Sequence, residues 1–262
     1  MLQQTRTETV ERYYARFLEN FPTVFHLAAA PEDAVLKLWE GLGYYSRVRN
    51  LKKAAGEIME RHGGVFPETH AEVSDLAGIG PYTAGAICSI AFNLPTPAVD
   101  GNVLRVVSRL LNDSTPIDLL ETKKTVTEAL AEIYPKEAGD FTQALMELGA
   151  TVCGPNRAPE CKNCPCREIC LAFREGTAEN LPVKSPKKEK RQEDRTVFVL
   201  HCDGRYALEK RPNKGLLAGL WQFPNVSGHL NTAESLAAAG KMGLSPRDIL
   251  REVERKHIFT HI

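Results

Sequence analysis

The stretch LAGIGPYTAGAICSIAFNLPTPAVDGN, residues 76–102, decides how the first half of the chain folds. Gly78 and Gly80 allow a tight turn, and Pro81 suits the first position of the helix that follows it. Backbone N–H groups at such a helix start can hold a phosphate oxygen without reading a base. The same GxG pattern also occurs at ordinary corners between two helices, so the turn alone does not establish a binding site.

A carboxylate follows this turn at Asp100. The two prolines in residues 93–99 exclude a helix there, whereas apolar residues recur at helical spacing afterwards: Val103, Leu104, Val106, Val107, Leu110 and Leu111. Asp100 or Asn102 is therefore expected to cap a helix by accepting hydrogen bonds from its first amides. A second role is compatible with capping, because a carboxylate beside a phosphate-holding turn can stabilise a cationic sugar while a base–sugar bond breaks.

Four cysteines have the compact spacing C-x7-C-x2-C-x5-C: Cys153, Cys161, Cys164 and Cys170. Thiolates at these separations can hold one metal centre, and both a zinc ion and an iron-sulfur cluster are compatible with the pattern. Cys166 lies inside the last gap and is interpreted as a bystander. Cys88 and Cys202 are expected to be small buried hydrophobic residues.

The composition predicts a soluble, cytoplasmic, monomeric protein of two domains. The chain has 262 residues with 43% hydrophobic content, which is enough for a substantial core. Its formal net charge is zero, so any surface that binds nucleic acid must come from local clusters of basic residues. No apolar run has the length of a membrane span, and no secretory pattern opens the chain. In such a compartment, clustered cysteines are expected to bind metal rather than form disulfides.

A change of pattern divides the chain. Residues 181–195 are charged, contain two prolines and lack an apolar stripe, which predicts a linker. Helical periodicity prevails before it, and afterwards residues 196–202 and 205–210 flank Asp203-Gly204 as in a β-hairpin. We therefore predict a mainly α domain over residues 1–180 and a partial α+β domain over residues 196–262.

Taken together, these motifs resemble the endonuclease III superfamily of DNA glycosylases. Its helix-hairpin-helix and catalytic aspartate look like LAGIGPYTAGA, within residues 71–92, and VDGNV at residues 99–103. MLQQTRTETV at 1–10, GLGYYSRVRNL at 41–51 and FTQALMELGATVC at 141–153 resemble the MutY branch. The resemblance runs over the whole chain and implies base excision repair of double-stranded DNA: hydrolytic removal of adenine mispaired with 8-oxoguanine or guanine, after the base is flipped out of the duplex.

The resemblance also implies roles for individual residues. Asp100 would stabilise the sugar, with Asn102 and Tyr82 as further catalytic residues. Enzymes of the superfamily that also nick the strand carry a lysine where this chain has Tyr82, whose phenol can instead hydrogen-bond to Asp100 or a phosphate. Contacts to DNA are implied for a set of residues along the chain: Gln3, Gln4, Thr5, Leu42, Tyr44, Arg47, Gly78, Gly80, Thr83, Gln143, Thr260 and His261. The basic residues Arg47, Arg49, Lys52 and Lys53 are either a solvated helix face or phosphate contacts.

The same family likeness favours a [4Fe-4S] cluster over zinc in the loop of residues 153–170, although the family's first gap is generally six residues. KRPNKGLLAGLWQFP at 210–224 resembles the MutT-like, or Nudix-like, domain of these enzymes. The glutamate-rich helix of an active Nudix hydrolase has no counterpart in residues 225–245, so recognition of 8-oxoguanine is implied instead. Residues 259–261, Phe-Thr-His, match the family's Phe-Ser-His loop.

One departure concerns the general acid. In the family, a glutamate two residues before the MLQQT motif protonates the departing adenine, and here the motif begins at Met1. Two alternatives to an adenine glycosylase therefore stay open: a lesion-binding fragment without turnover, and an endonuclease III-like glycosylase/lyase, which Tyr82 disfavours.

Overall fold

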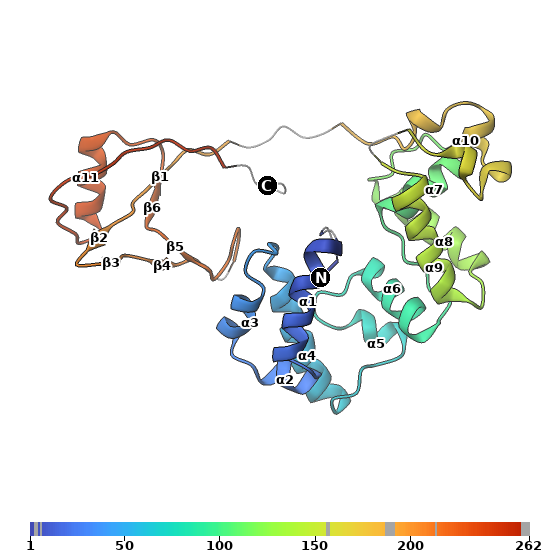
Figure 1. Cartoon of the computed structure of the whole chain (residues 1–262), viewed down its shortest axis with the longest axis horizontal. Helices are drawn as coiled ribbons and strands as arrows, with labels where there is room; N and C mark the ends of the chain where they lie inside the picture. Colours follow the sequence, from blue (N-terminus) through green and yellow to red (C-terminus); the bar gives the residue numbers. More distant parts are fainter. Residues whose placement is uncertain (3–4, 6, 156–157, 187–191, 213, 258–262) are drawn as a thin grey trace. The chain divides into compact units, whose positions relative to one another are not determined.

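The computed structural model describes residues 1–2, 5, 7–155, 158–186, 192–212 and 214–257. The chain forms two compact units, Met1–Pro186 and Lys187–Ile262, and each is described here by itself. The first unit is built from helices, and the second holds short strands and one helix (Figure 1).

The helical unit runs through α1 (Thr7–Asn20), α2 (Val24–Ala29), α3 (Glu32–Leu38), α4 (Ser46–His62), α5 (His70–Ser74), α6 (Pro81–Phe92), α7 (Gly101–Leu111), α8 (Leu120–Ile133), α9 (Ala138–Glu147) and α10 (Leu171–Arg174). Short helical turns complete it: the π-helix η1 (Leu148–Val152) and the 3-10 helices η2 (Cys161–Asn163), η3 (Arg167–Ile169) and η4 (Ala178–Asn180). Among the described residues, no helix is both long and apolar enough to cross a bilayer.

The predicted start of α6 and the predicted break before α7 are confirmed. Pro81 occupies the first turn of α6, where its missing N–H costs nothing. Asn93 ends α6 in a left-handed conformation with φ 52°, and the chain then runs without helix to the N-cap Asp100. The turn and the carboxylate therefore lie at the starts of two successive helices.

Apolar side chains from α1 to α4 form the largest core cluster: Phe17, Leu27, Val35, Trp39, Leu42, Val48 and Ala55. Smaller clusters continue it through α4, α5 and α6, around Leu76 and Val73. A buried hydroxyl network then joins α6 to α9, because Thr142 Oγ1 donates to Ser89 Oγ at 2.8 Å. These contacts hold α6 between the core and α9 (Figure 1).

The segment that delivers Asp100 lies directly against α6. A Cβ on Gly85 would stand 2.0 Å from the carbonyl oxygen of Pro97, which no side chain can tolerate. Thr96 Oγ1 also donates to the Gly85 carbonyl at 3.4 Å. The missing side chain of Gly85 thus lets the extended segment approach the helix backbone.

Among the described residues of the second unit, six short strands pair two by two: β1 (Arg195–Val197) with β6 (Asn225–Ser227), β2 (His201–Cys202) with β3 (Arg205–Tyr206), and β4 (Glu209–Lys210) with β5 (Trp221–Gln222), all antiparallel. Helix α11 (Thr232–Lys241) follows them. The predicted turn is present, with positive φ at both Asp203 and Gly204. The hairpin around it is shorter than predicted, because β1 and β4 find their partners later in the chain, which alternation alone does not reveal.

Two further predictions differ from the structure. Residues 181–186, predicted to start a linker, belong to the helical unit: Leu181 is buried beside Ala172 and Ala178, and Val183 accepts a hydrogen bond from Ile117. Cys202, predicted to be buried, is exposed, since β2 lies in a two-stranded ladder whose side chains remain exposed. Cys88 is fully buried as predicted.

Candidate functional site

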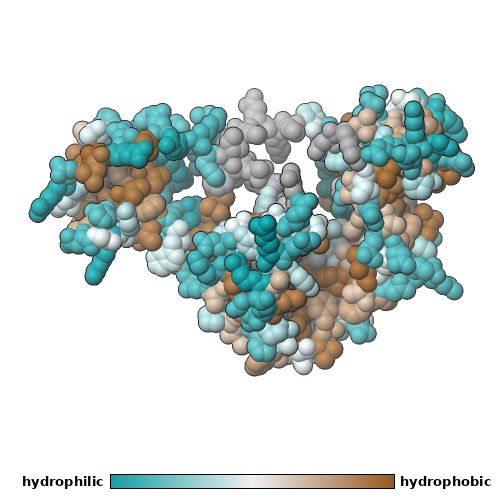
Figure 2. Space-filling model, viewed as in Figure 1, coloured by the Kyte–Doolittle hydropathy of each residue, from teal (hydrophilic) through white to brown (hydrophobic). Residues whose placement is uncertain are grey.

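A broad groove of about 3390 Å³ crosses the helical unit. Residues from α1, α4, α6, α7 and α9 line it, and they include the predicted turn and the predicted carboxylate. Figure 2 shows apolar side chains gathered over the part of this unit that carries α4, α5 and α6. A long substrate can therefore lie across the helix starts, where backbone amides point outward.

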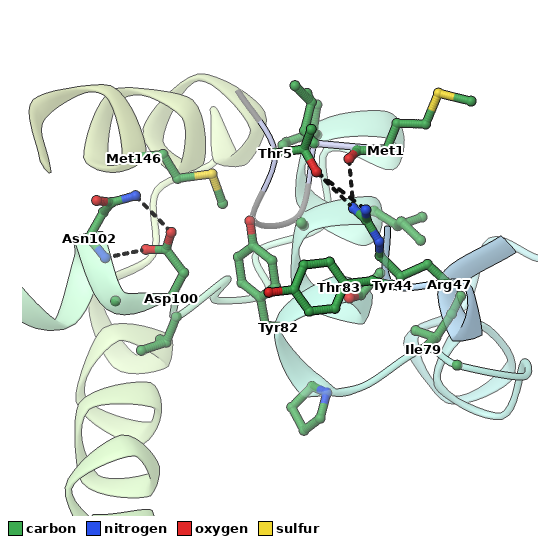
Figure 3. Close-up of a pocket in the computed structure, with 18 of the residues that line it drawn as sticks. Met1, Thr5, Tyr44, Arg47, Ile79, Tyr82, Thr83, Asp100, Asn102 and Met146 are labelled. Atoms are coloured by element: carbon green, nitrogen blue, oxygen red, sulfur yellow. Dashed lines mark hydrogen bonds between the residues drawn. The ribbon is translucent and has the colours of Figure 1, made fainter. Parts of the chain in front are cut away.

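The Asp100 carboxylate is fixed by three hydrogen bonds. Oδ1 accepts from the backbone N–H groups of Asn102 and Val103, each at 2.8 Å, and Oδ2 accepts from Asn102 Nδ2 at 2.9 Å (Figure 3). The expected helix capping is thus present. The half-buried carboxylate also borders the groove, at the start of α7. Capping and a charge-stabilising role coexist at this residue.

Tyr82 borders the groove from the first turn of α6 (Figure 3). Burial, and then the negative charge of Asp100, raise the pKa of its phenol. The Asp100 carboxylate accepts its hydrogen bonds from Asn102 and Val103, so the structure does not contain the suggested bond from the phenol to Asp100. Tyr82 therefore stays a neutral hydrogen-bond donor that is available for another acceptor.

The two glycines of the turn differ in what surrounds them. Gly78 has φ +76°, and a Cβ there would lie 2.4 Å from the Asn50 side chain. Gly80 is extended, and a Cβ there would meet no protein atom within 4 Å. Packing against Asn50 thus explains the glycine at position 78. At Gly80 no protein atom fills the adjacent space, which is open to a ligand.

Arg105 supports the carboxylate from behind. This nearly buried residue, 5% exposed, donates from Nη2 to Asn102 Oδ1 at 2.8 Å and to the Gly149 carbonyl at 2.6 Å. Its Nε donates to the Cys153 carbonyl at 2.7 Å, and burial lowers the pKa of the guanidinium. Asn102 is therefore held between Asp100 and Arg105. Sequence reasoning missed Arg105, whose only indication was a charge among the buried apolar positions of α7.

Arg109, one turn further along α7, contacts the cysteine loop. Its Nη1 donates to Cys153 Sγ at 3.1 Å, and its Nε donates to the Leu181 carbonyl at 3.0 Å. The Cys170 thiol in turn donates to the Arg109 carbonyl at 3.4 Å. One face of α7 therefore joins the Asp100 site to the cysteines.

The four predicted ligands and Cys166 line one small cavity, together with apolar residues of α7 and η1. Burial raises the pKa of Cys161, and the neighbouring Cys170, Cys153 and Cys164 add to this effect. No His, Asp or Glu lines the cavity, so its donors are thiols. Within the described ranges, no three His, Cys, Asp or Glu side chains are close enough to hold a single ion. An all-thiol donor set is compatible with zinc and with an iron-sulfur cluster.

Arg47, predicted to contact phosphate, lines the groove and also forms contacts within the protein. Its Nη1 donates to the Met1 carbonyl at 2.8 Å, and both terminal nitrogens lie 3.3 Å from Thr5 Oγ1 (Figure 3). The guanidinium also stacks 5.3 Å from the ring centres of Trp39 and Tyr44. Arg47 therefore organises the start of the chain and the Tyr44 turn.

Leu42 also differs from its prediction as a DNA contact, since only 6% of its surface is exposed and its side chain packs in the α1–α4 core. The next basic residues use their charges within the protein: Arg49 pairs with Glu32, Lys52 donates to the Ala28 carbonyl, and Lys53 lies 3.8 Å from Glu57. The acceptors of Arg49 and Lys52 lie on neighbouring helices, whereas Glu57 lies one turn from Lys53 on α4. Phosphate contact by these residues stays a prediction.

The remaining predicted contacts divide into two groups. Thr5, Tyr44, Thr83 and Gln143 line the groove, and Tyr44 is 37% exposed with φ 47°. The predictions for Gln3, Gln4, Thr260 and His261 lie outside the described residues.

Comparisons with known proteins agree with this geometry. Residues 1–136 match the model of the HhH-GPD superfamily base excision DNA repair proteins, and residues 196–262 match that of the NUDIX domain. Adenine DNA glycosylases of Arabidopsis thaliana and Schizosaccharomyces pombe are 37% and 33% identical over 100% of this chain. The chain spans 49% of the first relative's length and 68% of the second's.

Two solved structures share the fold of the helical unit at 26% identity. A thermostable thymine-DNA glycosylase superposes with a TM-score of 0.60 over 66% of this chain and 80% of its own. A trapped covalent intermediate of endonuclease III with DNA superposes with a TM-score of 0.57 over 67% of this chain and 81% of its own.

Proposed function

The chain belongs to the HhH-GPD superfamily of base excision DNA repair proteins, and from this premise we propose that it is an adenine DNA glycosylase that hydrolyses the bond between adenine and deoxyribose in duplex DNA. The relatives that match over the whole chain carry the name of this activity. The substrate adenine is paired with 8-oxoguanine or guanine, and it leaves the base stack before reaction.

The observation that carries the proposal is the Asp100 carboxylate. Three hydrogen bonds fix it at the edge of a groove that also contains the turn of residues 78–81. Backbone amides at the start of α6 bind a phosphate of the substrate strand, which brings the adjoining sugar toward the carboxylate. As the base departs, positive charge develops on that sugar, and Asp100 stabilises it without reorganising.

Tyr82 supports hydrolysis without strand cleavage. A glycosylase that also cleaves the strand needs an amine to form a Schiff base with the sugar, and a phenol cannot do this. The raised pKa of Tyr82 keeps the phenol protonated, so it donates a hydrogen bond to a phosphate oxygen. Water therefore completes the reaction, and Asn102 keeps the carboxylate aligned.

Gln143 and Thr83 extend the proposed DNA surface. Both line the groove, and Gln143 is exposed on α9, where its amide meets the edge of the extruded adenine. Tyr44 and Thr5 border the groove beside α4 and contact the opposite base. The space before Gly80 admits the phosphate itself.

The four cysteines Cys153, Cys161, Cys164 and Cys170 hold a [4Fe-4S] cluster. The shared cavity, its all-thiol donors and the similarity to endonuclease III support this assignment. When bound, the cluster supplies a rigid cross-link for the loop of residues 153–170. Arg109 then neutralises part of the thiolate charge through its contact with Cys153 Sγ.

The second unit serves recognition of 8-oxoguanine rather than hydrolysis of pyrophosphates. Residues 196–262 match the NUDIX model, yet the acidic residue in the first turn of α11 has another use. Glu234 forms a capping box with Asn231, which commits its carboxylate to the backbone. The helix thus lacks the row of glutamates that binds magnesium in a pyrophosphohydrolase.

A single-turnover assay tests the proposal. The protein is incubated with end-labelled duplexes that carry 8-oxoguanine:adenine, guanine:adenine or thymine:adenine pairs, and alkali then reveals abasic sites. We expect release of adenine from the first two duplexes and none from the third. Binding of the lesion duplex without adenine release would contradict the enzyme and support a binding module. A covalent adduct trapped by borohydride would contradict monofunctional hydrolysis.

A further inference from the structure

Cys166 shares the orientation of the proposed cluster ligands. In the segment from residue 161 to 170, Cys161, Cys164, Cys166 and Cys170 are half buried, and the remaining residues are exposed. Even Ile169 points to solvent, with 70% of its surface exposed. Hydrophobic packing alone would have favoured this isoleucine over a thiol at an inward position. The loop therefore turns its thiols inward selectively, and Cys166 is one of them.

Cys166 lies close to Cys164. Both side chains line the same cavity, and only Pro165 separates them in the sequence. The side chains of Cys166 and Cys164 are also within hydrogen-bonding reach of each other. Among the ligands, Cys164 is thus the one whose place Cys166 can take with the least movement.

We propose that Cys166 is a reserve ligand, able to bind the iron that Cys164 otherwise holds. The inference rests on the [4Fe-4S] cluster of the proposed function and adds a fifth thiol to it. In the exchange, Cys166 releases its proton to solvent and its thiolate forms a bond to iron, while the bond from Cys164 to iron breaks and the Cys164 thiolate takes up a proton. No electron is transferred, so no oxidant or reductant is required.

Four variants test this exchange: Cys164→Ala, Cys161→Ala, Cys166→Ala and the double variant Cys164→Ala/Cys166→Ala. Iron and acid-labile sulfide per chain are measured, together with the visible charge-transfer absorption of the purified protein. We expect Cys164→Ala and Cys166→Ala to keep most of the iron. Cys161→Ala and the double variant should retain severalfold less, because Cys166 does not substitute for Cys161. The exposed Cys202→Ala variant controls for loss of a thiol elsewhere.

The outcomes separate the two proposals. A wild-type protein without iron contradicts the cluster itself. If the wild type holds iron but Cys164→Ala loses as much as Cys161→Ala, the reserve role is wrong. It is also wrong if the double variant keeps as much iron as Cys164→Ala, because the iron is then held without Cys166.

A second measurement does not depend on the folding of Cys164→Ala. Wild type and Cys166→Ala, both loaded with iron, are exposed to ferricyanide and a chelator, and loss of the visible absorption is followed in time. A reserve ligand recaptures iron when a bond to Cys164 opens, so Cys166→Ala should lose its cluster severalfold faster. Equal rates of loss would overturn the proposal.

Discussion

The two ends of α7 face opposite kinds of environment. At its start, Asp100 is held by donors on one side and borders the groove on the other. Toward its end, Arg109 contacts Cys153 Sγ in a small cavity where the thiols turn inward. The difference shows how one rigid helix keeps a reactive side chain accessible while its other end is anchored. Arg105 lies between the two regions and contacts both.

The sharpest way to break this comparison is to remove the charge at the accessible end. Asp100→Asn keeps the cap acceptor but loses the negative charge that stabilises the sugar. We expect adenine release in single turnover to fall by roughly a hundredfold or more, with binding to the lesion duplex unchanged. Retained turnover would show that the groove end of α7 does not carry the chemistry.

Removing the connector between the two ends should cost mainly stability. Arg105→Met removes a donor from three carbonyl oxygens, those of Asn102, Gly149 and Cys153, and the last of these keeps its bond from Arg109 Nη1. We expect the free energy of unfolding of the helical unit to fall by about 3 kcal/mol, measured by urea denaturation, with slower turnover in the remaining folded protein. Arg174→Met, whose exposed side chain pairs only with Glu175, is the matched control and should stay within about 0.5 kcal/mol of wild type.

A single methyl group tests how closely η1 must approach α7. A Cβ on Gly149 would lie 2.7 Å from Asn102 Cβ, so Gly149→Ala should push the side chain that aligns Asp100. We expect a loss of about 2 kcal/mol in stability and slower adenine release. Gly56→Ala in α4, where nothing lies within 4 Å, should instead gain about 0.5 kcal/mol or more. Equal stability for both variants would remove the close contact as a constraint.

Tyr82→Phe should have the smallest effect, because the phenol is not bonded to Asp100. We expect adenine release to slow by less than about tenfold. The raised pKa keeps the phenol protonated beyond its ordinary value of 10.0, so the ratio of the two rates should stay constant between neutral pH and about pH 9. A ratio that changes across this range would show that Tyr82 loses its proton during the reaction.

The raised pKa of Tyr82 also gives the stability of the protein a small dependence on pH. Burial favours the protonated phenol, so its contribution is present below the ordinary pKa and is lost as the pH rises through the higher value of the folded state. Comparing urea denaturation of Tyr82→Phe and wild type across alkaline pH measures this contribution.

Local rules predicted the starts of the two helices at the site. Pro81 and Asp100 were placed correctly because a proline at a first turn and a capping carboxylate act through their own neighbours in the chain. The assignment of the family followed from several motifs in one order. Asp100, Tyr82 and Asn102 were found in this way, and their catalytic roles stay predictions.

Interactions between distant residues were beyond this reasoning. Arg47 looked like a phosphate contact, and its partners Met1 and Thr5 lie more than forty positions away. The burial of Leu42 could not be predicted for the same reason, because it depends on which helices pack around this residue. Arg105 was missed for the reverse reason, since its carbonyl partners at positions 149 and 153 carry no trace in the sequence.

The contact between Gly85 and Pro97 has a consequence for how this chain can vary in length. Because α6 and the segment after it touch through their backbones, the distance from the turn to Asp100 is fixed. An insertion between residues 81 and 100 would move the carboxylate away from the turn, and in the proposed function away from the sugar. By the family resemblance, the gap between Cys153 and Cys161 is where this chain carries one residue more than the family generally has. Insertions and deletions among homologues should therefore occur in that loop rather than between residues 81 and 100.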